Sequence, residues 1–214
     1  MSRVGCQFGL PRSGLYAVAD WYMDGIGGVW QQSKGAGLTQ LGASNSARHF
    51  LTIETRRIKD VREGLRQCRD LGATAWVQLR DPYNWLSSLH QGVIEMAVAW
   101  RPPQPLDRWK EYARHCVEDR TWLNYNSWFG DADYRRELAG RFGFRQHRNG
   151  EPWQHVADRG GGSSFDKKTY AGRAQEMAVE TRYRRFVNES WWRNQFDDEV
   201  AALAEQLFGM KRPW

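Results

Sequence analysis

Val4-Gly5-Cys6-Gln7-Phe8-Gly9-Leu10-Pro11-Arg12-Ser13-Gly14 begins as a short apolar run and ends as a turn rich in glycine and proline. The run over 4–8 predicts a buried strand, and 9–14 predicts a loop. From Leu15 to Met23 apolar residues recur at helical spacing, so a helix follows the loop directly. A strand that passes through a tight loop into a helix is the unit from which parallel α/β sheets are built.

The rest of the chain repeats this alternation. Further strands are predicted over 50–54, 74–79 and 121–125, and further helices over 58–71, 82–96, 106–117, 134–142 and 197–208. We expect irregular, loop-like structure over 24–47 and 145–168, and a long polar helix from Ala171 onward. Alternating strands and helices predict a mainly parallel sheet flanked by helices, in one domain spanning 1–214.

The net charge favours anionic ligands such as nucleotides, sulfated or phosphorylated substrates and nucleic acid. Lys and Arg number 31 against 25 Asp and Glu, a formal net charge of +6, without a basic tract of the kind that binds nucleic acid. No stretch is apolar enough to span a membrane, and the first residues do not resemble a signal peptide, so we expect a cytoplasmic protein. Cys6, Cys68 and Cys116 have the spacing of neither a disulfide framework nor a metal site.

The first candidate site is the loop Pro11-Arg12-Ser13-Gly14. Backbone N–H groups at the start of a helix bind phosphate, Gly14 allows close approach, and Arg12 adds a charged fork. The loop departs from the GxxxxGK[ST] pattern, because Leu15 and Tyr16 stand where Lys and Ser/Thr belong. An ATPase or GTPase with a normal Mg²⁺ site is therefore disfavoured. A plain strand–loop–helix turn is the alternative.

The second candidate is Arg80-Asp81-Pro82, with Ser88 farther along the same predicted helix. Arg80 ends a predicted strand, and ligands of parallel sheets bind at the carboxyl ends of strands. Asp81 is a typical N-cap and Pro82 a typical first helical residue. The alternative is an ordinary surface arginine paired with an acid.

Together the two motifs resemble the PAPS-dependent sulfotransferase family, in which PAPS is 3′-phosphoadenosine 5′-phosphosulfate. That family carries [K/R]-S-G-T-[TS] after its first strand, where this chain has Arg12-Ser13-Gly14-Leu15-Tyr16. It also holds the 3′-phosphate with an Arg and a Ser eight residues later, which Arg80 and Ser88 match. The resemblance implies a three-layer P-loop NTPase-like α/β domain.

Softer similarities extend along the chain. Glu54 ends the second predicted strand, where some members carry an acid, and 161–165 resembles a glycine-rich loop that closes over the 3′-phosphate. Tyr125-Asn126 stands where the family has Tyr-Glu. Leu15 and Tyr16 replace the hydroxyl pair that usually donates to the 5′-phosphate.

The resemblance implies transfer of a sulfuryl group from PAPS to a hydroxyl or amine of a small-molecule or saccharide acceptor, without a metal. The residues implied in binding PAPS and its product adenosine 3′,5′-bisphosphate (PAP) are Pro11, Arg12, Ser13, Gly14, Leu15, Tyr16, Arg80, Ser88, Gly162, Ser163, Ser164 and Phe165. Arg12 would stabilise charge on the transferred group. Transfer also needs a general base.

Glu54 is the first candidate for this base, followed by His49, His90 and His115. Alternatively, Glu54 pairs with a nearby arginine and only orders the loop. Trp153, Trp191 and Trp192 either contact the acceptor or, as we favour, pack the helical part. Two other functions stay open: a P-loop-related kinase or glycosyltransferase-like enzyme, and a non-catalytic nucleotide-binding module.

Overall fold

The computed structural model describes residues 4–27, 29–34, 49–55, 57–95, 105–119, 121–144, 154–156, 163 and 165–214. Within these residues five strands form one sheet in the order β2-β3-β1-β4-β5, and every neighbouring pair is parallel. The strands are β1 (Val4–Gly9), β2 (Val29–Lys34), β3 (His49–Glu54), β4 (Thr74–Leu79) and β5 (Trp122–Asn124). The predicted parallel α/β class is confirmed.

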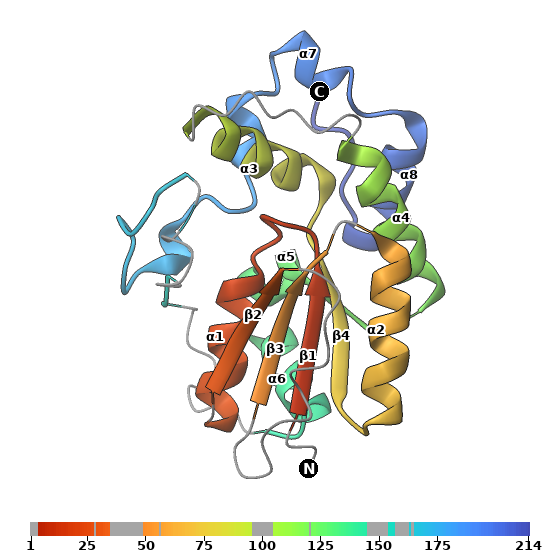
Figure 1. Cartoon of the computed structure of the whole chain (residues 1–214). Coiled ribbons are helices and arrows are strands. Elements are labelled where there is room, and N and C mark those ends of the chain that lie inside the picture. The colour runs from red at the N-terminus through yellow and green to blue at the C-terminus, as the bar shows by residue number, and fades with distance from the viewer. Residues whose placement is uncertain are drawn as a thin grey trace.

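Helices connect the strands and cover both faces of the sheet (Figure 1). The α-helices are α1 (Leu15–Ile26), α2 (Ile58–Asp70), α3 (Pro82–Glu95), α4 (Pro105–Glu118), α5 (Tyr125–Gly130), α6 (Ala132–Arg141), α7 (Ser190–Arg193) and α8 (Asp198–Phe208). Two 3₁₀ helices, η3 (Ala174–Glu176) and η4 (Arg182–Arg185), lie in the carboxyl-terminal third.

Successive side chains of each strand point to opposite faces of the sheet, and each face forms an apolar core with the helices that cover it. The fold therefore has three layers, with the sheet between two layers of helices. On β1, Cys6 and Phe8 face the core built with α2, α4 and α8. On β3 and β4, Phe50 and Trp76 face the opposite core with α1, α5 and α6, where their rings stack at 5.3 Å between centroids. This alternation follows from the two-residue period of a strand.

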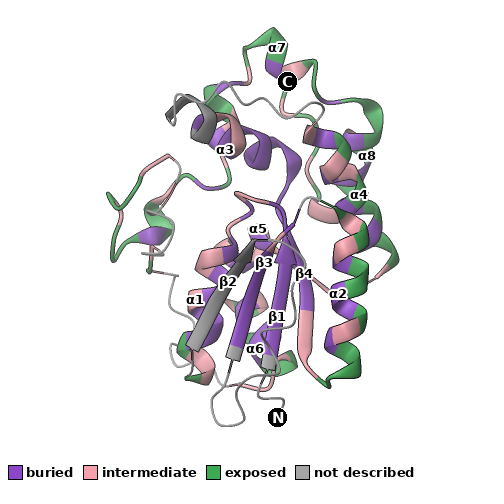
Figure 2. Cartoon of the chain, in the orientation of Figure 1, coloured by how far each residue is buried: buried purple, intermediate pink, exposed green. Residues whose placement is uncertain are grey.

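Helix α3 lies over the carboxyl ends of the strands, and its first turns are buried on all sides (Figures 1 and 2). Asp81 caps it as predicted, because its Oδ1 accepts from the backbone N–H of Asn84 at 2.8 Å. Three polar residues of these turns, Asn84, Ser87 and Ser88, are almost completely buried. Buried polar groups require partners, so this end of α3 is a place to look for a site.

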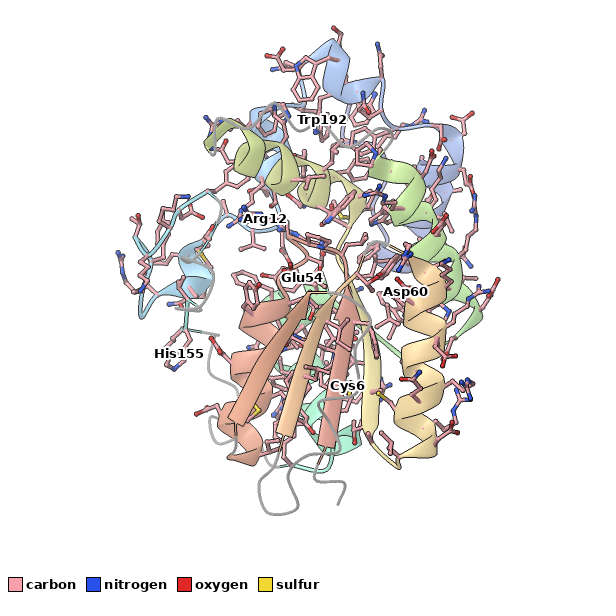
Figure 3. The ribbon with its side chains drawn as sticks, viewed as in Figure 1. Cys6, Arg12, Glu54, Asp60, His155 and Trp192 are labelled. Atoms are coloured by element: carbon pink, nitrogen blue, oxygen red, sulfur yellow. The ribbon has the colours of Figure 1, made fainter. Side chains whose placement is uncertain are left out.

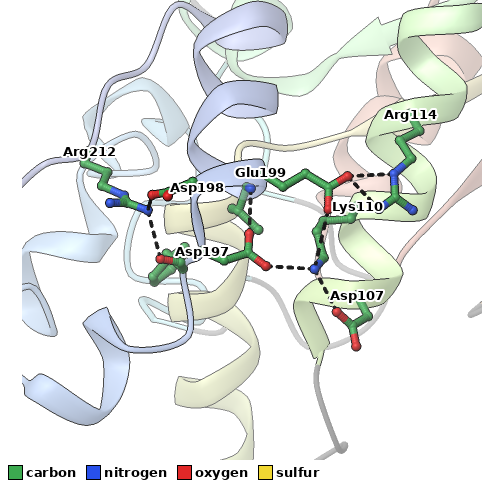
Figure 4. A network of polar contacts seen from close by, with 9 residues as sticks. Asp107, Lys110, Arg114, Asp197, Asp198, Glu199 and Arg212 are labelled. Carbon is green, nitrogen blue, oxygen red and sulfur yellow. Dashed lines mark hydrogen bonds and ion pairs between the residues drawn. The ribbon is translucent and has the colours of Figure 1, made fainter.

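Helix α8 packs on α4, and charged side chains also link the two helices (Figure 4). Lys110 contacts Asp107 at 3.0 Å and Asp197 at 2.9 Å, and Arg114 donates to Glu199 at 2.7 Å. The acids of these pairs are exposed to solvent, so each pair contributes little stability individually. The apolar contacts of Val200 and its neighbours in α8 therefore account for most of the docking.

Three expectations about elements were wrong or incomplete. The 24–47 stretch contains β2, the edge strand, rather than only loop; 35–48 lies outside the described residues. Helix α5 was not predicted. The long polar helix expected from Ala171 is absent from the described chain, which has turns and the short helices η3, η4 and α7 there.

Candidate functional site

Three buried side chains fix the loop between β1 and α1. Gln78 donates to the Ser13 carbonyl at 2.7 Å, Gln7 donates to the Leu15 carbonyl at 2.6 Å, and the Trp85 indole N–H donates to the Pro11 carbonyl at 2.9 Å. Carbonyls at alternate positions are thus turned toward the protein. The loop is held in one conformation by β1, β4 and α3.

The backbone of this loop exposes amides rather than carbonyls. Arg12 and Gly14 both have positive φ, 66° and 86°. No side chain caps α1, and no described residue accepts a hydrogen bond from the N–H of Gly14 or Leu15. Free amides at a helix start, next to a left-handed residue, form a concavity that suits an anion.

Some side chains of the loop are buried in the protein, whereas Arg12 is not engaged by a described acid. The Ser13 hydroxyl is buried and donates to the Leu10 carbonyl at 2.7 Å. Arg12 forms no ion pair with any described residue, so its guanidinium is available to a ligand. Leu15 is buried in the core.

Glu54 and Arg12 lie at the same edge of the sheet (Figure 3). β3 ends at Glu54, which is in register with Gly9 at the end of β1. Tyr16, on the first turn of α1, is hydrogen-bonded to Glu54; burial first, and then Glu54, raise the pKa of Tyr16. The phenol therefore stays protonated and donates to the carboxylate. Arg57 pairs with Asp60 at 2.7 Å instead of with Glu54.

Two buried arginines meet at one serine hydroxyl. Arg80 Nη1 donates to Ser88 Oγ at 2.9 Å. Arg182, from η4, donates to the same oxygen at 3.3 Å. Arg80 also donates to the Val179 carbonyl. The second arginine comes from a segment 94 residues away in sequence and was not predicted.

This arginine pair has excess positive charge. Arg80 and Arg182 are 2% and 9% exposed. Burial, reinforced by Arg182, lowers the pKa of Arg80 to about 10, and burial also lowers the pKa of Arg182. The Nε atoms of both arginines have no hydrogen-bond partner in the described structure. Buried like charges with unused donors are costly unless an anion joins them.

One acid and one ring surround Arg182. Its Nη2 contacts Asp166 Oδ2 at 3.0 Å and Ser163 Oγ at 2.6 Å. Its guanidinium lies over the Phe165 ring, 4.8 Å from the centroid. The structure thus brings two residues of the expected 162–165 loop to the arginine pair. Gly162 and Ser164 lie outside the described residues.

Tyr125 links the arginine pair to the β1–α1 loop. The guanidinium of Arg80 lies 5.4 Å from the centroid of its ring. A Cβ added to Gly14 would come within 2.1 Å of the same ring, so Gly14 leaves room for it. The two predicted motifs therefore lie next to each other, on either side of the Tyr125 ring.

Asn126 supports the residue that caps α3. Its amide donates to Asp81 Oδ2 at 2.8 Å, and its Oδ1 accepts from the Asp81 backbone N–H at 3.3 Å. A glutamate in its place would put a second negative charge against the carboxylate that caps α3.

A cavity of about 450 Å³ adjoins this site. It is lined by residues of α5, α6 and the 175–181 segment, including Val179, whose carbonyl accepts from Arg80. Its volume falls in the range of small-ligand pockets. Glu180 also lines it; burial, and then Asp81, raise the pKa of this carboxyl.

The other candidate side chains lie elsewhere. His49 begins β3, at the end opposite Glu54. His90 packs against Trp191, with ring centroids 4.3 Å apart, and His115 is a buried residue of α4 whose pKa is lowered by burial. Trp192 is fully buried, as the packing alternative predicted, whereas Trp191 is 40% exposed. Trp153 lies outside the described residues.

Sequence reasoning missed most of the supporting residues. Arg182 gave only a weak signal, because it lies in the arginine-rich stretch Arg182-Tyr183-Arg184-Arg185 of a segment that was expected to be a polar helix. Asp166 lies in the stretch 145–168, which was expected to be loop-like. Gln7 and Gln78 gave a clearer one, since a glutamine inside an otherwise apolar buried strand needs a polar partner.

The described residues contain no group of three or more His, Cys, Asp or Glu side chains placed to bind a metal ion. Nor does the described part of the chain contain a helix with the length and apolarity needed to cross a membrane.

Comparison with known proteins shows the fold. No protein-family model matches the chain, and no curated protein matches its sequence. Among solved structures it is similar to mouse sulfotransferase SULT7A1 complexed with PAP, at a TM-score of 0.52 and 10% identity, over 97% of this chain and 84% of that one. At this identity the similarity establishes a sulfotransferase-like α/β fold.

Proposed function

We propose that this protein transfers a sulfuryl group from PAPS to a hydroxyl or amine of a small-molecule or saccharide acceptor, and that residues 1–214 act as one domain. The observation that carries the proposal is the buried pair of Arg80 and Arg182 on Ser88, joined through Tyr125 to a loop with free amides. Two anion sites linked by one ring suit a nucleotide with phosphates at both its 3′ and 5′ positions.

The residues fit such a donor. Arg80, Arg182 and Ser88 would bind the 3′-phosphate, because their unused donors and excess charge require an anion. The amides of Gly14 and Leu15 would bind the 5′-phosphate, and the cavity beside Val179 provides volume for the adenosine. Ser13 would contribute backbone rather than hydroxyl, since the hydroxyl is engaged within the loop.

PAPS supplies an activated sulfuryl group, whose sulfur–oxygen bond to the 5′-phosphate breaks as one to the acceptor forms. Arg12 would stabilise the charge that develops on the sulfuryl oxygens. Glu54 would take the acceptor proton, held by Tyr16 at the sheet edge. We propose no metal, because the arginines and amides provide the positive field.

The donor is tested by calorimetry with PAP and ADP. We expect the wild-type protein to prefer PAP, because ADP has no 3′-phosphate for the arginine pair. Arg80→Ala should cost about 1.5–3 kcal/mol of PAP binding, the contribution of a charge-assisted hydrogen bond, and should leave ADP binding almost unchanged.

Equal affinity of the wild-type protein for PAP and ADP would overturn the proposal and favour a kinase-like relative. PAP binding without turnover, in assays with radiolabelled PAPS and a panel of acceptors, would instead identify a non-catalytic module.

A further inference from the structure

The two arginines of the site differ in their acidic contacts. Arg182 has a carboxylate in contact, Asp166, at 3.0 Å. Arg80 makes no ion pair within the described chain; Asp81 and Glu180 affect it only through space. The pair therefore carries two positive charges against one negative charge in direct contact.

This charge balance changes when a phosphate binds. A dianionic phosphate on both arginines neutralises them completely, so Asp166 would then add an uncompensated negative charge next to the phosphate. Like charges in close contact in a buried site are unfavourable. Neutrality is kept only if the carboxylate leaves Arg182 as the phosphate arrives.

Asp166 is placed so that it can leave. Its side chain is 25% exposed while that of Arg182 is 8% exposed, so the acid approaches the arginine from the solvent side. It lies in a turn closed by the Ser163–Lys167 bridge. Lys167 and Arg12 are the two described non-glycine residues with positive φ, and strained residues of this kind concentrate at functional sites.

We propose that Asp166 is a displaceable counterion. In the empty protein it occupies the position on Arg182 that a phosphate oxygen occupies once the nucleotide is bound. It lowers the affinity of the site for phosphate and so favours release of PAP after transfer. The inference rests on the proposed function for the identity of the nucleotide.

The test is Asp166→Asn, which removes the charge and keeps an oxygen for Ser163 and the turn. In calorimetry it should bind PAP and inorganic phosphate about 5–10-fold more tightly than the wild-type protein does, which is about 1–1.4 kcal/mol. Binding of adenosine 5′-monophosphate, which lacks the 3′-phosphate, should not change. Asp166→Ser should show the same gain and guards against a specific folding defect of the asparagine variant.

Asp198→Asn is the matched control, because Asp198 pairs with Arg212 at 2.8 Å on the surface of α8 (Figure 4). It makes the same change in net charge and should leave all three affinities unchanged. The gain from Asp166→Asn should also vanish in an Arg182→Ala background, since the competition acts on that guanidinium.

Unchanged or weaker phosphate and PAP binding by Asp166→Asn would overturn the inference, since Asp166 would then position Arg182 rather than compete for it. The proposed function fails separately. If the variant gains affinity for phosphate but the wild-type protein does not prefer PAP over ADP, the counterion role stands and the sulfotransferase assignment falls.

Discussion

At the scale of single residues, Arg12 combines an unusual backbone with a free charge. Its φ of 66° lies in the left-handed region, and no described acid pairs with it. A non-glycine residue in this region of φ costs about 1 kcal/mol of folding free energy. This backbone strain lies at the residue that would stabilise charge on a transferred group.

Arg12→Gly should separate stability from activity. Glycine relieves the strain but adds freedom to the unfolded chain, so the free energy of unfolding should change by less than about 1 kcal/mol. Turnover should fall by about 10²–10³, the loss typical of one transition-state donor. Urea unfolding and initial rates measure the two effects, and Arg12→Lys should recover part of the rate. An unfolded variant, or full activity, would contradict this role.

Glu54 is the second residue whose role can be isolated. Glu54→Gln keeps an oxygen for Tyr16 and removes the negative charge. PAP binding should survive and turnover should fall by about 10²–10⁴, as expected for loss of a general base. Calorimetry and single-turnover rates check this. If binding and rate are both unchanged, Glu54 only orders the loop and the base lies elsewhere.

At the scale of elements, the β1–α1 turn and the start of α5 depend on each other through Gly14 and Tyr125. Gly14→Ala adds a Cβ within 2.1 Å of the Tyr125 ring at φ 86°. Gly172→Ala is the matched control, since Gly172 has φ 80° and nothing within 4 Å of the added atom.

The control should lose about 1 kcal/mol of stability from backbone strain alone. Gly14→Ala should lose a further amount of about 1–3 kcal/mol from overpacking, and should weaken PAP binding by moving Tyr125 away from Arg80. Chemical unfolding of both variants gives the difference. Equal losses would show that the ring moves freely and does not link the motifs.

The elements that were predicted correctly share strong local signals. β1, β3, β4 and α2 have clear periodicity, and the caps Asp81 and Gly209 mark helix ends that the structure confirms. Strand β2 was missed because an edge strand with the sequence VWQQSK lacks the apolar pattern of a buried strand. The segment from Ala171 reads as helical only because it is polar and rich in residues that favour helices.

The candidate site was only partly predictable for a different reason. Loop and strand-end residues are local features, and the resemblance to the sulfotransferase family pointed to Arg80 and Ser88. Arg182 reaches Ser88 across 94 residues, and Asp166 reaches Arg182 from a turn with no regular pattern. Contacts of this length depend on tertiary packing, which no local window of sequence contains.

At the scale of the whole molecule, buried tyrosines should make the free energy of unfolding fall as the pH rises above about 10. Burial is the leading cause that raises the pKa of five tyrosines, which are Tyr16, Tyr83 (to about 12), Tyr112, Tyr125 and Tyr134. Below about pH 10 these phenols are protonated in both states, so they cause no pH dependence. Above it they ionise first in the unfolded chain, which binds fewer protons than the folded protein, so stability falls as pH rises.

The expected loss is about 1.4 kcal/mol per pH unit for each such tyrosine. Three buried arginines work in the opposite direction, because the folded protein gives up a costly buried charge when one of them loses its proton. Burial lowers the pKa of Arg80 to about 10 and also lowers the pKa values of Arg135 and Arg182, but these are three groups against five. Urea unfolding at about pH 8 and about pH 11 measures the net effect. Tyr112→Phe, which removes a hydrogen bond of 2.9 Å to Thr55, should lower stability at the lower pH but make the alkaline decline shallower. A stability that stays level up to the higher pH would contradict the argument.

The Trp85 indole gives the molecule an optical reporter. Its N–H donates a hydrogen bond to the Pro11 carbonyl, so the fluorophore contacts the β1–α1 loop directly while its ring is buried. Indole emission responds to the local electric field, and an anion brought to the amides of this loop changes that field. Ligand binding is therefore readable from intrinsic emission without a label, and the spectral difference between the wild-type protein and Trp85→Phe isolates this signal from that of the other tryptophans.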